Sequence, residues 1–405
     1  MSQTTKRGAG ALAGFKVIDL TRVLGGPYCT QILGDHGATI LKVEPPQGDE
    51  TRGWGPPFRD GFSSYFVNVN RNKRSLGLDL TKADGRAAFL RLLEGADVLI
   101  ENFKPGTMER WGIGYDVLSA KYPRLIHCRI SGFGADGPFG GAPGYDAAVQ
   151  AWAGLMSTNG SPESGPMRIG TALVDMVTGL YAGFGIMIAA REREVSGKGQ
   201  FLETTLYDCA VALTHPFAQN YFFSGKTPVL TGSAHPTIAP YNLYPTKGRP
   251  IFLAVGNDRQ FRRLCEELGA PKLAEDPRFR TNADRQVNRP ALEDALRPLL
   301  VNHDGATLAA RLMDIGVPAG AALSIPDVFA HPHTLHREML VEKDGFKWAG
   351  VPIKFERTPG YVRSVPPRFG ADGRAILKDA GFSAKEIDDL AATGALCEVQ
   401  AKAPE

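Results

Sequence analysis

The sequence predicts an α/β protein with a largely parallel, doubly wound sheet and a second, smaller α+β domain. Three observations lead to this prediction. Strand and helix patterns alternate over residues 15–206, which is typical of βαβ units. Several of the strand patterns are almost continuously apolar, as in sheets that helices cover on both faces. Near Ser224 this alternation ends in a stretch that contains several prolines and glycines.

The first half supplies the strands of the sheet. Residues 15–20 are predicted to form a strand, and Gly25, Gly26 and Pro27 then turn the chain into a helix that reaches about residue 34. The further elements are strands at 38–44, 74–80, 98–100, 124–130 and 201–206, and a helix at 82–93. Residues 132–144 are rich in glycine and proline and predict a long loop, a kind of segment that often carries function.

Residues 173–190 are apolar over the length of a membrane span and contain one charge, Asp175. Gly179, Gly183, Gly185 and the acid itself argue against a span. We therefore expect a buried helix in a large soluble core, and no contact with a membrane.

The second half predicts a smaller domain. A hairpin is expected from 241–244 and 251–255, and helices from 259–268, 291–300 and 306–315. After His336 the pattern is irregular, with a short strand at 351–355. Ser383 and Glu386 form a Ser-x-x-Glu capping box, which predicts a late helix at 383–392.

Composition excludes several classes of protein. The chain has 405 residues, 22% charged residues and a net charge of +3, so it is neither globally disordered nor a basic nucleic-acid binder. Its 5 cysteines are far apart, which argues against a disulfide scaffold and favours a reducing compartment. The first residues lack the apolar core of a signal peptide, and we expect a cytoplasmic location.

Familiar cofactor motifs are incomplete. Gly25, Gly26 and Pro27 follow a strand, and Glu44 ends the next one, but GxGxxG is missing and proline has no backbone donor for a pyrophosphate. His331, His333 and His336 do not have the spacing of a zinc site. Neither a P-loop nor GxSxG occurs. We therefore expect no nicotinamide and no metal.

Asp175 is the most informative single residue. It is the one charge between Ile169 and Ala190, where the chain enters the apolar helix. It could cap that helix, or it could be a nucleophile or base in a poorly solvated pocket, because desolvation makes a carboxylate more reactive. Gly179 and Gly183 keep one face of the helix thin, which permits either close packing or the approach of a ligand.

Eight short motifs occur in order along the chain. They are Leu24–Pro27 with Leu33–Asp35 and Gly37–Ala38; Lys42–Glu44 with Gly48–Asp49; Asn72–Ser75; Val98–Gly106; Ser131–Gly134; Gly144–Asp146; Gly170–Asp175; and Gly197–Gln200. Together they resemble the class III CoA-transferases over roughly residues 11–395. That family contains formyl-CoA, carnitine and dicarboxylate CoA-transferases, and also α-methylacyl-CoA racemase.

This resemblance implies a fold beyond what the patterns indicate. The two chain ends, residues 1–224 and 336–405, would form a large Rossmann-like domain, and residues 225–335 an inserted smaller one. Each subunit would be an open ring, and two rings would interlock into a homodimer.

The resemblance also implies a chemistry. Asp175 would attack an acyl-CoA thioester and give first an aspartyl anhydride and then an aspartyl-CoA thioester. Acyl-CoA is a substrate here, and no permanently bound cofactor is implied. The positions expected to contact CoA are Val23 and Leu24 along the pantetheine path, and Asn72, Lys73, Arg74, Asn102, Phe103, Arg110 and Tyr145.

Two alternatives remain beside the transferase. Racemases of this family have a histidine where this chain has Tyr145, and tyrosine, with an ordinary pKa of about 10, is a poorer base. A CoA-binding protein without turnover would have no use for Asp175. Both alternatives are therefore weaker than the transferase.

Substrate choice depends on the smaller domain. Residues 232–241 lack the run of glycines found in the oxalate-using branch. They are more similar to the branch that uses succinyl-CoA with C4–C6 dicarboxylic acids. A second carboxylate would need a cation, for which Arg22, Arg52, Arg71 and Arg168 are candidates.

Overall fold

The structure is a computed structural model that describes residue 8 and residues 10–398. The chain divides into two compact units, so the two are described separately. The larger contains residues up to Leu155, then Ile169–His215, then the chain from Leu335 onward. The smaller contains Met156–Arg168 and Pro216–Thr334. The division differs from the predicted boundaries at 156–168 and at 216–224, two short segments that we had placed in the large domain.

A seven-stranded sheet forms the centre of the larger unit, in the order β10-β7-β6-β1-β2-β5-β16. The strands are β1 Lys16–Asp19, β2 Thr39–Glu44, β5 Lys73–Leu78, β6 Val98–Glu101, β7 Ile126–Ser131, β10 Phe201–Thr205 and β16 Leu396–Cys397. All neighbours are parallel except β16, which runs antiparallel to β5. The predicted α/β class is therefore confirmed. Numbered along the chain, the six parallel strands have the 3-2-1-4-5-6 order of a Rossmann fold.

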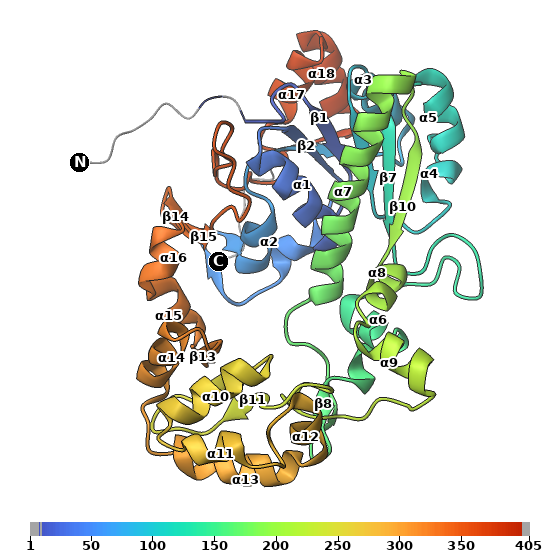
Figure 1. Ribbon diagram of the computed structural model, residues 1–405. Coiled ribbons are helices and arrows are strands. Elements are labelled where there is room, and N and C mark those ends of the chain that lie inside the picture. Colours follow the sequence, from blue (N-terminus) through green and yellow to red (C-terminus); the bar gives the residue numbers. More distant parts are fainter. Residues whose placement is uncertain (1–7, 9, 399–405) are drawn as a thin grey trace. The chain divides into compact units, whose positions relative to one another are not determined.

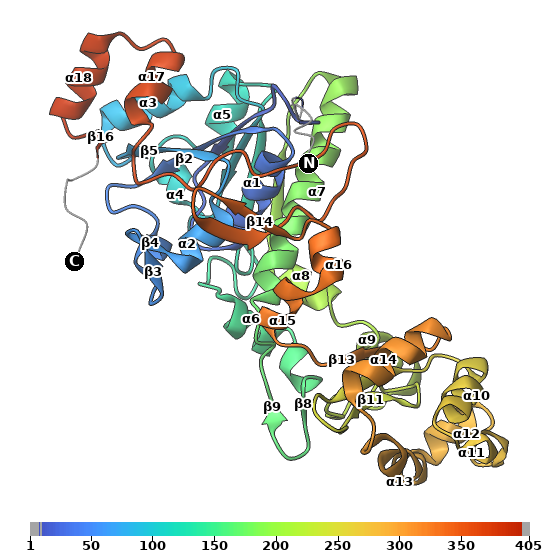
Figure 2. The same cartoon turned by 90° about the vertical axis from the view of Figure 1, so that its left-hand side faces the viewer.

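Helices cover both faces of this sheet. Consecutive strand residues such as Val17 and Ile18 belong to different apolar cores, because side chains alternate across a strand. One face carries α1 Gly25–Asp35, α6 Asp146–Trp152, α7 Leu173–Ser196 and α8 Leu206–Ala212. The other carries α3 Ala83–Leu92, α4 Thr107–Arg110, α5 Tyr115–Lys121, α17 Gly373–Asp379 and α18 Ala384–Ala392. Figure 1 shows α1 and α7 side by side, and Figure 2 shows α17 and α18 next to α3.

Shorter elements complete the larger unit. They are η1 Glu50–Gly53, β3 Phe58–Arg59, β4 Phe62–Ser63, α2 Ser64–Val69, η2 Leu155–Ser157 (which continues into the smaller unit), β14 Leu340–Lys343 and β15 Phe346–Ala349. The helix expected at 383–392 is confirmed as α18, with the Ser383–Glu386 capping box in place. The strand expected at 351–355 is wrong. Pro352 lacks a ladder donor, and Ile353 and Phe355 are exposed rather than packed.

α7 differs from the expectation of a buried helix. It buries one face, which includes Val174, Gly179, Ala182 and Ile186, against α1 and the sheet. The opposite face exposes large apolar side chains: Leu180, Tyr181, Phe184, Met187 and Ile188. By length and composition α7 could also cross a membrane, and only 39% of its most apolar window is buried within the chain. We had not foreseen this exposed apolar face.

The smaller unit has its own core around a three-stranded antiparallel sheet of β11 Tyr241–Tyr244, β12 Ile251–Ala254 and β13 Ala319–Ala321. The predicted hairpin is thus confirmed as β11 and β12. The remaining elements are β8 Gly160–Ser161, β9 Gly165–Pro166, α9 Phe217–Ser224, α10 Asp258–Glu267, α11 Pro271–Glu275, α12 Asn282–Val287, α13 Arg289–Leu300, α14 Gly305–Asp314 and α15 Ile325–Ala330. α16 Pro332–His336 lies where the chain returns to the larger unit.

Candidate functional site

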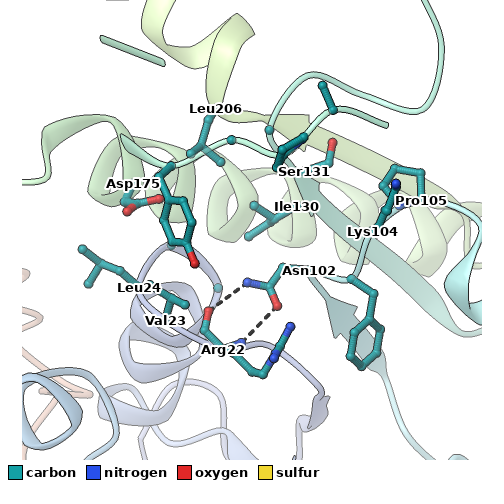
Figure 3. Close-up of a pocket in the computed structure, with 18 of the residues that line it drawn as sticks. Arg22, Val23, Leu24, Asn102, Lys104, Pro105, Ile130, Ser131, Asp175 and Leu206 are labelled. Carbon is teal, nitrogen blue, oxygen red and sulfur yellow. Dashed lines mark hydrogen bonds between the residues drawn. The ribbon is translucent and has the colours of Figure 1, made fainter. Parts of the chain in front are cut away.

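A cavity of about 340 Å³ opens where the strand order of the large sheet reverses. The chain leaves β1 and β6, which are neighbours, toward opposite sides, so their carboxyl ends leave a crevice between them. The lining comes from the turn after β1, the loop after β6, the 132–144 loop and the start of α7. It includes Val23, Leu24, Gly25, Asn102, Phe103, Lys104, Ser131, Gly144, Tyr145 and Asp175. Figure 3 shows Asp175 and Leu206 on one side and Lys104 and Pro105 on the other.

Gly25 and Gly179 bring the first turn of α1 against α7, and Gly26 lets the same turn close on Thr21. A methyl group on Gly26 would overlap Thr21, and one on Gly179 would overlap the carbonyl oxygen of Gly25. A methyl group on Gly25 would lie 3.2 Å from the backbone oxygen of Asp175 and 3.8 Å from its Oδ1. Gly179 therefore serves close helix packing, one of the two roles that we had left open. The packing sets the Gly25 backbone directly beside the Asp175 carboxylate.

Asp146, rather than Asp175, caps α7. Its Oδ2 accepts hydrogen bonds from the backbone N–H groups of Val174 at 2.7 Å and Asp175 at 3.2 Å. Gln150 donates to the other oxygen of Asp146 at 2.6 Å and accepts from the N–H of Ile169, which holds the segment that enters α7. This settles the helix-cap alternative for Asp175. Its own carboxylate faces the cavity without a capping role.

The surroundings of Asp175 oppose its negative charge. Burial, and after it the nearby charge of Asp146, raise the pKa of this carboxyl to about 7. Among the residues that the structure describes, no cation pairs with Asp175. A carboxylate at such a position is partly ionised near neutrality and poorly solvated, which suits a nucleophile or a base.

Tyr65 is a neighbour of this site that we had not singled out. It belongs to α2, is half-buried and packs edge-on against Trp54. Burial, and after it the charges of Asp175, Asp146 and Asp49, raise the pKa of Tyr65 to about 12. Its hydroxyl therefore keeps its proton around neutral pH. Tyr65 lies 110 residues from Asp175 in sequence, so no local pattern could have linked the two.

Comparison with known proteins identifies the family. The family model described as CoA-transferase family III matches residues 12–373. The chain belongs to this family. It is similar to the succinate–glutarate CoA-transferase of Agrobacterium fabrum, with 39% identity over 91% of this chain and 95% of the relative. It is equally similar to the acetyl-CoA:oxalate CoA-transferase of Acetobacter aceti, with 39% identity over 95% of this chain and 100% of the relative.

Solved structures agree with this assignment. A CaiB/BaiF family protein from Brucella suis has a TM-score of 0.84 and 40% identity, and the match covers 92% of this chain and 100% of that one. Rv3272 from Mycobacterium tuberculosis has a TM-score of 0.82 and 30% identity, over 91% and 99%. The expected family is therefore confirmed, and the chain is a CoA-transferase.

Five of the predicted CoA contacts of this CoA-transferase lie around the cavity with Asp175. They are Val23, Leu24, Asn102, Phe103 and Tyr145. Asn102 is already engaged within the protein. Its amide accepts from the N–H of Arg22 at 3.0 Å and donates to the carbonyl of Arg22 at 2.8 Å (Figure 3). Asn102 therefore shapes the turn after β1. Tyr145 precedes α6 and is 57% exposed, so it is accessible from the cavity.

Asn72 is not among the described residues that line the cavity. Its side chain donates to Asp35 at 2.7 Å and accepts from the backbone N–H groups of Arg363 and Ser364 at 2.6 and 3.0 Å. It also adopts a left-handed backbone, with φ of 60°. Asn72 thus fastens the returning C-terminal segment to the sheet, a role that differs from the CoA contact we predicted.

Lys73, Arg74 and Arg110 also lie outside the lining. Lys73 is buried and donates to Asp19 at 3.2 Å and to the carbonyl of Pro27 at 2.9 Å. Arg74 pairs with Asp379 at 2.8 Å, and Arg110 donates to Thr107 within α4. The structure therefore gives these three cations partners inside the protein. Their contact with CoA stays a prediction, and this geometry does not favour it.

A second cavity, of about 520 Å³, adjoins the first and shares Arg22, Phe103 and Lys104 with it. It lies beyond the carboxyl ends of β1, β2 and β5, and Trp111 also lines it. The rings of Phe103 and Trp111 meet edge-to-face, with their centroids 5.3 Å apart. The two cavities together form a site that extends well beyond the Asp175 carboxylate.

Of the four arginines considered for a second carboxylate, the structure favours Arg22. Arg52 makes a bidentate ion pair with Glu44, and Arg71 makes one with Asp35. Arg168 belongs to the smaller unit. Arg22 lines both cavities, its Nε is buried without a hydrogen-bond partner among the described residues, and its nearest acid, Glu50, is 4.0 Å away.

Proposed function

We propose that this CoA-transferase moves CoA from one carboxylic acid to another through Asp175. The observation that carries the proposal is the carboxylate itself. It faces the cavity at the reversal point of the sheet, another residue caps its helix, and burial together with Asp146 raises its pKa to about 7. Such a group is costly to keep in a fold and is explained by use in a reaction.

In the proposed reaction, an Oδ of Asp175 attacks the thioester carbonyl of the donor. The C–S bond breaks, an aspartyl–acyl anhydride forms, and CoA leaves as a thiolate. The thiolate then attacks the Asp175 carbonyl, which gives an aspartyl-CoA thioester and releases the donor acid as a carboxylate. The acceptor carboxylate repeats both steps in reverse. Each intermediate is sensitive to hydrolysis, so water has to be excluded.

Both attacks create an oxyanion that needs hydrogen-bond donors. The first N–H groups of α1 have no partners inside their own helix, and no side chain caps them. Gly25, in this first turn, is beside the Asp175 carboxylate. We propose that the N–H groups of Gly25 and Gly26 stabilise the oxyanions.

The proposed substrates follow from the relatives and from Arg22. Relatives at 33–39% identity are named for succinate–glutarate, succinyl-CoA:mesaconate and succinyl-CoA–D-citramalate exchange. These names, with the absence of a glycine run in residues 232–241, support succinyl-CoA as donor and a C4–C6 dicarboxylate as acceptor. Arg22 would bind an anionic group of the substrate. The oxalate-using relative at 39% identity makes oxalate the second candidate acceptor.

The second cavity is the proposed place of the CoA nucleotide. Phe103 and Trp111 offer apolar surface to a base, and Lys104 offers a cation to phosphates where the two cavities join. The pantetheine arm would then pass Val23 and Leu24 toward Asp175.

We also propose that the enzyme acts as a homodimer, with the interlocked rings that the resemblance implies. The support is the exposed apolar face of α7, where Leu180, Phe184 and Ile188 recur every four residues. Light scattering on the purified chain, and on a Phe184→Glu variant, tests this. A wild type that stays monomeric at micromolar concentration contradicts it. The cytoplasmic location stays a prediction.

Mass spectrometry under denaturing conditions tests the function. After incubation with succinyl-CoA or acetyl-CoA, we expect a CoA-sized adduct on the peptide that contains Asp175, absent in Asp175→Asn. New acyl-CoA formed from glutarate, mesaconate or oxalate then identifies the acceptor. Deuterium gained at the α-carbon of a branched acyl-CoA in deuterated water, without transfer, would instead establish the racemase. Binding of CoA without adduct, transfer or exchange would leave the non-catalytic alternative.

A further inference from the structure

The turn after β1 has an unusual backbone. Val23 adopts φ of 70°, in the left-handed region that β-branched residues rarely occupy. The turn lines the cavity and leads directly to Gly25, which lies beside Asp175. Strained backbone of this kind persists only where the surrounding structure holds it in place.

Side chains from three other segments hold this turn. Asp19, at the end of β1, accepts from the N–H and hydroxyl of Thr21 at 2.8 and 2.5 Å. Asn102 bonds to both the N–H and the carbonyl of Arg22. Lys42 donates to the carbonyl of Thr21 at 2.8 Å, and Asp49 accepts from the N–H of Val23 at 3.4 Å. Every peptide group from Thr21 to the N–H of Val23 thus has a partner.

Lys42 and Asp49 form an ion pair with no exposed side-chain surface and bond to the two ends of the strained segment, whereas Asp19, which is paired with Lys73 in the same buried way, bonds only to Thr21 in this turn. Nζ of Lys42 lies 2.8 Å from Oδ2 of Asp49, and Oδ1 of Asp49 also accepts from the N–H and hydroxyl of Thr51. A buried ion pair gives little or no net stability compared with apolar side chains of the same size. A gain in stability therefore does not account for the pair. Holding the backbone of the turn in a fixed geometry does.

We infer that the buried Lys42–Asp49 pair positions the Val23–Gly25 backbone against Asp175 and thereby sets the rate of acyl transfer. The inference rests on the proposed function. Neither residue is among the described residues that line the cavity, so both are positioning residues rather than catalytic ones. They act through the carbonyl of Thr21 and the N–H of Val23, at the two ends of the strained segment.

The test compares two double variants of the full-length chain, Lys42→Met/Asp49→Leu and Arg193→Met/Asp97→Leu. The second is a matched control. Arg193 also joins a carboxylate, Asp97 at 2.7 Å, to a backbone carbonyl, and Asp97 also accepts a backbone N–H, from Lys16 at 2.8 Å. This pair lies at the amino ends of β1 and β6, whereas the cavity lies at their carboxyl ends.

Two quantities are measured for each variant. They are the single-turnover rate at which the CoA adduct forms on Asp175, and the KM for the acyl-CoA donor. Removing Lys42 and Asp49 is expected to slow adduct formation about 10- to 100-fold while KM changes less than about threefold, because small displacements of a preorganised backbone affect the transition state most. The control pair is expected to change both quantities less than about threefold. Near-UV circular dichroism verifies that each variant is folded.

The inference would be overturned if the Lys42→Met/Asp49→Leu variant formed the adduct at the wild-type rate. It would also be overturned if the control variant were slowed to the same extent. If that double variant does not fold, the isosteric Asp49→Asn variant replaces it, at a temperature at which its near-UV circular dichroism shows a folded protein, and a wild-type rate there would overturn the inference as well. A wild-type enzyme that forms no adduct with any donor would overturn the proposed function and the inference together. An adduct in the wild type with unchanged rates in the variants would overturn only the inference.

Discussion

Asp175 and Asp49 are two carboxylates of the larger unit on which protein surroundings act in opposite directions. Burial and the charge of Asp146 together raise the pKa of Asp175 to about 7. Burial alone would also raise the pKa of Asp49, but the charge and hydrogen bond of Lys42, with the donors of Thr51, lower it to about 2. The difference therefore comes from the neighbours. Asp49 faces a cation and three donors, and Asp175 faces a second carboxylate, Asp146.

The comparison shows how one unit combines rigidity with reactivity. Lys42 and Asp49 neutralise each other and hold a strained turn in place. Asp175 keeps an uncompensated charge at the cavity that this turn lines. A group that is unfavourable in the folded state is available for reaction, while Lys42 and Asp49, which hold the adjoining turn, are paired with each other.

The largest expected effect is on turnover. Asp175→Asn keeps the shape of the side chain but removes the nucleophile, so we expect transferase activity to fall by about 10³-fold or more. Steady-state assays with the identified donor and acceptor measure this. Asp84→Asn, an exposed first-turn acid of α3, is the control and should keep full activity. More than a tenth of wild-type activity in Asp175→Asn would contradict the role of Asp175.

The next largest effect is on the free energy of unfolding when Asp49 is replaced. Asp49→Asn leaves Lys42 buried without its counter-charge, and we expect the free energy of unfolding at pH 7 to fall by roughly 3–5 kcal/mol. Because the folded pKa of Asp49 is lowered, its contribution is present above about pH 4 and is lost as the pH falls toward 2. Urea unfolding of the wild type and Asp49→Asn at pH 7 and near pH 2 measures this, because the difference between the two proteins should shrink at the lower pH. A change below 1 kcal/mol at pH 7 would show that Lys42 finds another partner.

At Asp175 the sign is reversed. Its folded pKa lies above that of the unfolded chain, so ionisation destabilises the fold increasingly from about pH 4 to pH 7 and by a constant amount above that. Asp175→Asn should therefore be more stable than the wild type at pH 8, by roughly 2–4 kcal/mol, and equal to it near pH 3.5. Thermal or urea unfolding of both proteins at the two pH values decides this. A variant that is less stable than the wild type at pH 8 would mean that Asp175 has a stabilising partner.

Much of this arrangement could be predicted from the sequence, because it depends on local patterns. Alternating apolar strands and helices indicated the sheet, and the motif before α1 marked the turn beside the cavity. Asp175 stood out because it is a lone charge in an apolar run. Its nucleophilic role came from the family resemblance, and the sequence alone left a helix cap equally open. Only the position of Asp146 in space settled that question.

The Asn72–Ser75 motif shows the limit of sequence reasoning. The family resemblance implied that Asn72, Lys73 and Arg74 contact CoA, and this contact stays a prediction. In the structure Asn72 and Lys73 bond to Asp35 and Asp19, which precede them by 37 and 54 residues, and Asn72 also bonds to the chain at 363–364. Partners so distant in sequence leave no local signal. The same limit explains why Tyr65 was missed, and why the exposed face of α7 was taken as buried.

The smallest effect separates the two causes that raise the pKa of Asp175. Asp146→Asn removes the neighbouring charge but keeps an oxygen that can accept from the N–H of Val174. Adduct formation requires ionised Asp175, so in the wild type its rate should rise with pH through about 7 and then level off. In Asp146→Asn the midpoint should move to lower pH, with the plateau rate little changed, because burial remains and the like charge is gone. Quenched single-turnover measurements between pH 5 and 9 give both midpoints, with Asp84→Asn as control. An unchanged midpoint would mean that burial alone raises the pKa of Asp175, and that Asp146 serves only to hold α7.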